Sequence, residues 1–304
     1  MGWEIMPWGS MRFLKVLMKS SLITPMIVGV IVSLVSLLSL PTLSLAQSQG
    51  GAQSQDEVEL TAQEFIAGNI LLTLYHEAGH ALISQYRLPV KGNEEDAVDL
   101  FSIFALTEEL NQGNLSEERE LKLDNYLFST ALYWLTMSEE EGFDNPEVLV
   151  EHSLDSERFI QHLCMIYGSD PEIYQDLPSD FGVQDLVTED CAELYQEKTA
   201  DWFKMLNPHR LGDRIRVDKI VIAEDEPDPR YKGYREWLHI HGILDEFENF
   251  MENSFHLQRK ITLRLKSCGQ ANAFWDPEQL EIILCDEQVA EYSHIYDRLI
   301  QEGG

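Results

Sequence analysis

Two histidines and a glutamate stand at metal-binding spacing inside an otherwise apolar stretch, LYHEAGHALISQY, at residues 74–86. His76, Glu77 and His80 form the pattern H-E-x-x-H, and the apolar residues around them recur with helical spacing. On a helix the two imidazoles project from one face and can share a metal ion, while Glu77 can take a proton from a metal-bound water. Two unconnected histidines are the alternative. Because buried histidines need polar partners, the apolar surroundings favour the metal site.

A third protein ligand is expected, since a catalytic zinc ion usually keeps three protein ligands and one open position for water. The acidic sequence NEEDAVD at residues 93–99 begins the next predicted helix and is the nearest source. We expect Glu95 to be this ligand, because Glu95 and Asp99 are four residues apart and share a helix face. Asp99 can then accept a hydrogen bond from the other ring nitrogen of one histidine. Glu94 is the rival ligand, because it projects toward the apolar side of the same helix.

Two further segments are weaker candidates for catalysis or substrate binding. His152 and Arg158 flank a predicted helix start and could stabilise the oxyanion of a hydrated peptide bond. Polar surface residues at a loop boundary are the alternative. The sequence ANAFWDP at residues 271–277 is similar to the strand with which some zinc peptidases hold substrate backbone, and a hairpin with a packed Trp275 is the alternative.

The N-terminus has the features of a targeting segment. Basic residues precede an apolar run, which ends in small residues: Arg12, Lys15 and Lys19, then 22–40 and 44–46. We favour a signal peptide over residues 1–46, cleaved after Ala46, although an apolar run of this length could also remain as an anchor across a membrane. A polar linker at residues 47–58 and a catalytic domain at residues 59–304 follow.

Composition limits the class of partner. The chain of 304 residues carries 22 basic and 53 acidic residues, a formal net charge of −31. Such a charge argues against nucleic acid as a partner, and the membrane enters only if the N-terminal segment stays uncleaved. A solvated acidic surface is the simplest interpretation.

The four cysteines are an even set in a chain that we expect to be exported, so two disulfides are expected. Three pairings are possible. We favour the sequence-local one, Cys164 with Cys191 and Cys268 with Cys285. A four-cysteine zinc site is the alternative, but the chain contains no C-x-x-C pair to support it.

The remaining pattern predicts an α+β fold that is mostly helical, with a small sheet near the metal-site helix. Apolar spacing and turn residues predict six helices, at about 57–86, 94–110, 116–137, up to 167, 185–206 and 234–255. Alternation predicts strands at about 215–223, 260–268 and 280–285, the last two forming a hairpin-like unit with a cysteine at each end.

The motifs together resemble the DUF4344 family of metallopeptidases. The likeness lies in LYHEAGHALISQYRLPVKGNEEDAVDLF, HSLDSERFIQHLCMIYGSDP and CGQANAFWDPEQLEIILC, and it covers most of residues 60–290. The resemblance implies an exported, zinc-dependent peptidase of the zincin type with paired cysteines. It does not identify the substrate beyond protein or peptide.

The sequence therefore predicts an extracytoplasmic, periplasmic or secreted, zinc metallopeptidase that hydrolyses peptide bonds with a metal-activated water. A zinc-stabilised extracytoplasmic binding protein without turnover is the alternative. The presence of Glu77 argues against it, because a purely structural metal site needs no general base.

Overall fold

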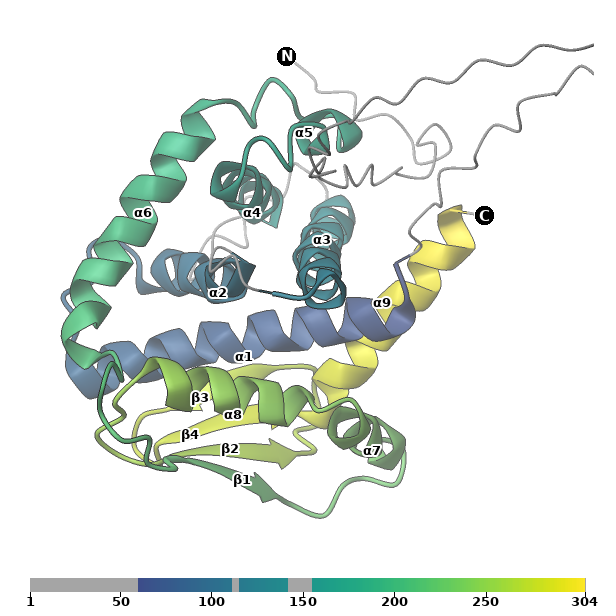
Figure 1. Ribbon diagram of the computed structural model, residues 1–304. Coiled ribbons are helices and arrows are strands. Elements are labelled where there is room, and N and C mark those ends of the chain that lie inside the picture. Colours follow the sequence, from purple (N-terminus) through teal and green to yellow (C-terminus); the bar gives the residue numbers. More distant parts are fainter. Residues whose placement is uncertain (1–59, 111–114, 142–154, 304) are drawn as a thin grey trace, which may run out of the picture. The chain divides into compact units, whose positions relative to one another are not determined.

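A computed structural model describes residues 60–110, 115–141 and 155–303 (Figure 1). The targeting segment expected at residues 1–46, the linker expected at 47–58 and His152 lie outside these residues. Within the described part the fold is mostly helical with one small mixed sheet, as the sequence predicts. No helix in these ranges is both long enough and apolar enough to cross a membrane.

Helix α1 (Ala62–Tyr86), which carries the H-E-x-x-H sequence, is the centre of the fold and is buried along most of its length. It begins later than the predicted start at residue 57, because Thr61 caps it. The Thr61 side chain accepts from the backbone N–H of Glu64, and the Glu64 carboxylate accepts from the backbone N–H of Thr61. The helix ends at Arg87, which adopts the left-handed conformation with φ 54°.

Helices cover one side of α1, and the sheet lies on the other (Figure 1). The helical side is formed by α2 (Glu94–Leu110), α3 (Glu117–Glu141), α4 (Asp155–Ser169), the short α5 (Leu177–Asp180), α6 (Asp190–Leu206) and the 3₁₀ helix η3 (Asn207–His209). The predicted disulfide between Cys164 and Cys191 is confirmed and ties α4 to α6. The predicted start of α6 at residue 185 is wrong by five residues, because residues 181–189 form turns.

The sheet has the strand order β1-β2-β4-β3. Its strands are β1 (Ile220–Glu224), β2 (Ile261–Lys266), β3 (Ala273–Asp276) and β4 (Glu281–Cys285). The predicted hairpin of the second and third predicted strands is wrong, because β2 and β4 pair in parallel. The antiparallel partner of β4 is β3, which lies within the segment predicted to be a connection. The predicted strand at 215–223 shortens to β1, because its partner strand begins only at Ile261.

Three helices complete the sheet side: α7 (Lys232–Ile240), α8 (Ile243–Ser254) and α9 (Asp286–Gly303). The prediction of one helix over residues 234–255 is wrong. Gly242 separates α7 from α8 with a φ of 66°, a left-handed conformation that glycine adopts readily and that ends an α-helix. The sequence pattern did not predict α9, which follows β4 without a break and packs against α1.

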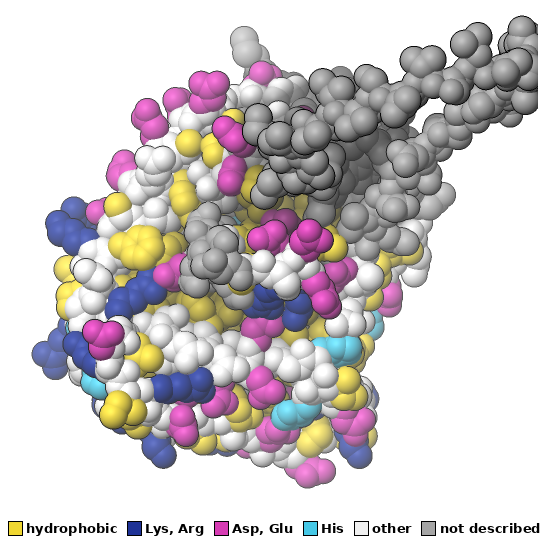
Figure 2. All heavy atoms as spheres, viewed as in Figure 1, with side chains coloured by type: hydrophobic (Ala, Val, Ile, Leu, Met, Phe, Trp, Pro, Cys, Tyr) yellow, Lys and Arg dark blue, Asp and Glu magenta, His cyan; other side chains and the backbone are white. Residues whose placement is uncertain are grey.

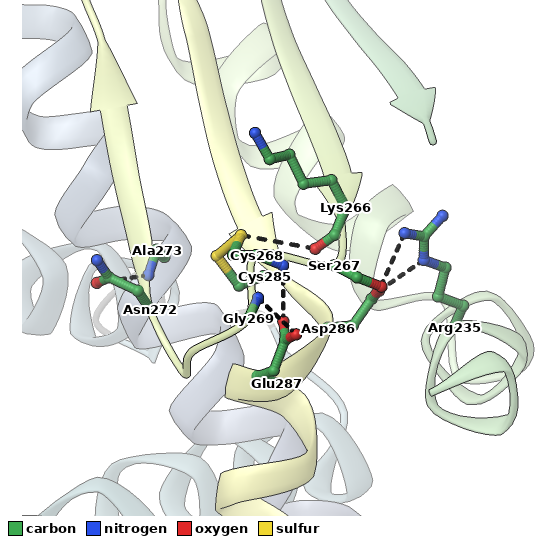
Figure 3. The surroundings of a disulfide bond; sticks show 10 residues. All are labelled: Arg235, Lys266, Ser267, Cys268, Gly269, Asn272, Ala273, Cys285, Asp286 and Glu287. Atoms are coloured by element: carbon green, nitrogen blue, oxygen red, sulfur yellow. Dashed lines mark hydrogen bonds and ion pairs between the residues drawn. A yellow bond between two sulfur atoms is a disulfide. The ribbon is translucent and has the colours of Figure 1, made fainter. Parts of the chain in front are cut away.

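The connection from β2 to β3 is fixed in place at the end of β4 (Figure 3). Because β4 lies between β2 and β3, residues 267–272 must pass over the carboxyl end of β4. The second predicted disulfide, Cys268–Cys285, is confirmed and joins this connection to the last residue of β4. The Glu287 carboxylate accepts hydrogen bonds from the backbone N–H groups of Cys268 and Gly269, at 3.0 and 2.8 Å. These bonds fix the point from which β3 starts.

A buried ion pair supports the same connection. Asp286, 3% exposed, accepts from Nε and Nη2 of Arg235, at 2.6 and 2.9 Å, and from the hydroxyl of Ser267 at 2.6 Å (Figure 3). Removing one partner of such a pair leaves an uncompensated buried charge, so the network holds α7 against the start of α9.

Many acidic residues of the described part are exposed at the surface. Figure 2 shows acidic side chains spread over the drawn face and interspersed with basic ones. The two disulfides of the described residues indicate an oxidising compartment.

Candidate metal centre

Helix α1 presents His76, Glu77 and His80 on neighbouring positions of one buried surface. The imidazole rings of His76 and His80 lie with their centroids 5.1 Å apart. Glu77 is 7% exposed, and the two histidine side chains are 14% and 15% exposed. The H-E-x-x-H spacing therefore brings two nitrogen donors and a carboxylate together at the edge of the core.

The first turn of α2 brings Glu95 to the same point. One Glu95 carboxylate oxygen lies 3.3 Å from Nε2 of His76, and the other lies 3.4 Å from Nε2 of His80. The potential ligand atoms of these three residues all lie within 4.8 Å of one another. The predicted site residues His76, His80 and Glu95 thus converge in the structure.

Gly79 explains how α2 comes close enough to α1. A Cβ atom built on Gly79 would lie 2.8 and 2.9 Å from two side-chain carbons of Val98, closer than real Cβ atoms approach other atoms. A glycine between the two histidines therefore allows the helices to pack tightly. Val98 is one turn beyond Glu95 on α2, so this contact also sets how far the Glu95 carboxylate lies from α1.

The three donors fit a zinc ion. Two imidazole nitrogens and one carboxylate are a donor set that catalytic zinc sites use. A tetrahedral zinc ion with bonds of about 2.0–2.1 Å holds its ligand atoms about 3.3 Å apart. The distances of 3.3 and 3.4 Å from the two Nε2 atoms to the Glu95 carboxylate, each to a different oxygen, are of that size.

Each histidine has a second carboxylate at its other ring nitrogen. Nδ1 of His76 lies 2.8 Å from Oδ1 of Asp99, and Nδ1 of His80 lies 2.8 Å from Oε1 of Glu94. A carboxylate accepting from Nδ1–H leaves the Nε2 lone pair for a metal. Glu94, which the sequence offered as a rival third ligand, lies on the Nδ1 side of His80.

These carboxylates change the pKa values of the histidines. Burial lowers the pKa of His76, but hydrogen bonds with Asp99 and Glu95 outweigh burial and raise it to about 9. Burial also lowers the pKa of His80, and hydrogen bonds with Glu95 and Glu94 raise it above its ordinary value. Hydrogen bonds with the two histidines hold the pKa of the Glu95 carboxyl far below its ordinary value. The centre therefore favours a bound cation, whether protons or a metal ion.

Glu77 has the environment of a general base. Burial raises the pKa of its carboxyl group, and the neighbouring His76 and His80 partly reverse this rise. The backbone N–H of Trp275 in β3 faces the Glu77 carboxylate and also lowers the pKa of this group. A raised pKa brings a carboxylate closer to the value at which it can take and return a proton near neutral pH.

The edge strand β3 directs its free side toward Glu77. The bond from the Cys285 N–H to the Asn272 carbonyl places Phe274 in the next hydrogen-bonded pair with β4. The backbone groups of Ala273 and Trp275 therefore point away from β4, and that of Trp275 meets Glu77. The sequence had singled out this segment, but only the pairing of β3 with β4 shows which of its groups point outward.

Arg158 lies on the far side of Asp99. Its Nε donates to Oδ2 of Asp99 at 2.8 Å, and its Nη2 donates to Oδ1 at 2.7 Å. The guanidinium also lies 4.1 Å from the centre of the Trp134 ring. The sequence suggested Arg158 for the oxyanion, and the structure places two of its nitrogens on Asp99. Nothing in the spacing of the sequence indicated Trp134.

Comparison with known families gives one match. The model of the DUF4344 family, described as "Putative metallopeptidase", matches residues 38–206 and 224–303. Searches of curated proteins and of solved structures return no match. The family model spans α1, the first turn of α2, Arg158 and β3, which carry the candidate metal centre and its supports. The chain therefore belongs to the DUF4344 family.

Proposed function

We propose that the protein is an extracytoplasmic zinc-dependent peptidase that hydrolyses peptide bonds in protein or peptide substrates. One observation carries the proposal: Nε2 of His76, Nε2 of His80 and the Glu95 carboxylate converge at ligand spacing beside a buried Glu77. A structural zinc site is normally closed by four protein ligands, whereas three ligands leave room for a water.

His76, His80 and Glu95 would hold the zinc ion. When bound, zinc supplies Lewis acidity that lowers the pKa of water and polarises a carbonyl group. Glu77 accepts the proton of the attacking water at its carboxylate and returns it to the leaving amine. The Trp275 N–H orients this carboxylate, and burial by the surrounding core keeps bulk water from it.

The edge strand β3 supports a peptide as the substrate. One outward group, the Trp275 N–H, faces the general base, and an extended peptide can pair with the remaining outward groups, such as those of Ala273, through main-chain hydrogen bonds. Main-chain pairing tolerates many side chains and would place a backbone carbonyl of the peptide near Glu77. This geometry favours peptide bonds over small esters or amides.

Location outside the cytoplasm is supported by the two disulfides and by the N-terminal pattern of basic, apolar and small residues. We propose that the segment is a signal peptide cleaved after Ala46. Edman sequencing of the protein recovered from the extracytoplasmic fraction would test this, and an intact N-terminus would indicate a retained anchor.

The test of the function compares the wild type with Glu77→Gln and His76→Ala. Zinc content is measured by elemental analysis, and hydrolysis is measured on a reduced, carboxymethylated protein. The wild type is expected to hold one zinc ion and to cleave. Glu77→Gln should keep zinc and lose cleavage by about 100-fold or more, because the general base is gone. Zinc without cleavage in the wild type would favour a zinc-stabilised binding protein, and wild-type cleavage by Glu77→Gln would exclude its role as base.

A further inference from the structure

Arg158 holds the carboxylate that supports His76. Oδ1 of Asp99 accepts a hydrogen bond from Nη2 of Arg158 at 2.7 Å and lies 2.8 Å from Nδ1 of His76. Oδ2 of Asp99 accepts a hydrogen bond from Nε of Arg158 at 2.8 Å. A planar guanidinium that donates to both oxygens fixes the plane and the rotation of the carboxylate. The Asp99 carboxylate is therefore held in one orientation when it accepts a hydrogen bond from His76.

The pair is set rigidly in the protein. The side chains of Arg158 and Asp99 are 13% and 15% exposed, and the Trp134 ring of α3 lies 4.1 Å from the guanidinium. Buried charge pairs with good hydrogen bonds are screened little by solvent. Three helices therefore contribute to this arrangement: α2 with Asp99, α3 with Trp134 and α4 with Arg158.

We propose that Arg158 is a positioning residue of the metal centre. Through Asp99 it fixes the imidazole ring of His76 and so directs Nε2 toward Glu95. This inference rests on the proposed function. Arg158 also compensates negative charge at the site. Its positive charge offsets one of the four carboxylates around the histidines: Glu77, Glu94, Glu95 and Asp99.

The test is a double-mutant cycle between Arg158 and Asp99, with the affinity for Zn²⁺ alone as the measurement and chelator competition as the method. Arg158→Met is expected to weaken Zn²⁺ binding about 10- to 100-fold, the range for residues that orient metal ligands. In the Asp99→Asn background the same change should alter affinity by less than about threefold, because Arg158 acts through Asp99. Arg158→Lys keeps the charge without the two-pronged donor, so its affinity should fall between those of the wild type and Arg158→Met.

Arg230→Met is the matched control. Arg230 makes the same two-nitrogen contact with Asp228, at 3.0 and 2.8 Å, but its side chain is 71% exposed. It should leave Zn²⁺ affinity unchanged. The visible spectrum of the Co²⁺-substituted protein gives a second readout, because a rotated His76 alters the ligand geometry and a merely structural defect elsewhere does not.

Several outcomes would overturn the inference. Equal effects of Arg158→Met in the two backgrounds would show that Arg158 does not act through Asp99. Unchanged Zn²⁺ affinity with a lowered kcat would assign Arg158 to the substrate, as the oxyanion interpretation requires. If Arg158→Met does not fold, Arg158→Lys decides, and wild-type affinity and Co²⁺ spectrum in that variant would contradict the proposal. Zinc binding without any turnover would contradict the proposed function but not this inference, because the double-mutant cycle measures only the affinity for Zn²⁺.

Discussion

His76 and His80 are one turn apart on the same helix, yet the carboxylates at their Nδ1 atoms differ in kind. Asp99, beside His76, is 15% exposed and is held by Arg158, whereas Glu94, beside His80, is 50% exposed. The hydrogen-bond distance is 2.8 Å on both sides. Distance alone therefore does not distinguish the two supports, and burial does. An exposed carboxylate can replace its hydrogen bond to histidine with one to water at little cost in free energy. A buried carboxylate cannot.

The largest expected difference is in the stability of the metal-free protein. Asp99→Asn removes the charge that compensates buried Arg158, so we expect a loss of about 3–5 kcal/mol in the free energy of unfolding. Glu94→Gln should cost less than about 1 kcal/mol, because the Glu94 side chain is itself half exposed to solvent. Urea unfolding after chelation measures both variants. Similar losses in the two variants would mean that burial does not separate the two supports.

A change at Gly79 should weaken both supports together. The added Cβ of Gly79→Ala would meet Val98 and push α2, which carries both Glu94 and Asp99, away from α1. We expect a stability loss of about 1–3 kcal/mol from overpacking.

The affinity of Gly79→Ala for zinc should also be lower than that of the wild type. Gly233→Ala is the control, because open space surrounds that position. Wild-type zinc affinity in Gly79→Ala would show that the helix contact does not set the ligand spacing.

The affinity for zinc should differ in the same sense between the two sides. Asp99→Asn is expected to weaken Zn²⁺ binding about 10- to 100-fold, and Glu94→Gln by less than about tenfold, since water can take the place of an exposed carboxylate. Chelator competition at one pH and one ionic strength gives both values. A larger loss in Glu94→Gln would reverse the ranking of the supports.

A further expected effect is an acid sensitivity that arises from a buried histidine on α4 and grows as the pH falls. Behind Arg158, buried His162 contacts the Thr130 hydroxyl at 2.7 Å, and burial lowers its pKa to about 3. Because the unfolded chain binds this proton near pH 6.5, stability should fall as the pH drops from about 6.5 toward 3, by up to about 1.4 kcal/mol per pH unit.

His162→Gln should flatten that slope in unfolding measurements on the metal-free protein. His239→Gln is the control, because its side chain is half exposed on the sheet side. An unchanged slope in His162→Gln would exclude His162 as the cause.

The sequence predicted those parts of the site that depend on one helix at a time. Helical spacing placed His76 and His80 on one face, and it placed Glu95 and Asp99 together on the next helix. It did not predict which histidine Asp99 supports, nor that Glu94 lies at Nδ1 of the other histidine, because both depend on how α2 is rotated against α1. The contact of Gly79 with Val98 decides the approach, and a sequence pattern contains no such distance.

The errors in the fold have a similar cause. Residues 260–268 and 280–285 are strand-like by pattern, but whether they pair in parallel depends on β3 taking the other side of β4. The sequence contains Gly242 but does not show its left-handed conformation. Because glycine also occurs within helices, the break between α7 and α8 could not be predicted from it.

The position of β3 beside Glu77 has a consequence for folding. His76 and Glu95 are separated by 95 − 76 = 19 residues, so the metal-binding helices can meet after closing a short loop. Trp275 and Glu77 are separated by 275 − 77 = 198 residues, and their contact needs the whole sheet in place. Contacts of low sequence separation form fastest, and closing long loops is slow. A chain folding from its N-terminus can therefore hold a metal ion before β3 arrives to complete the site, which would delay activity until the rest of the molecule has formed.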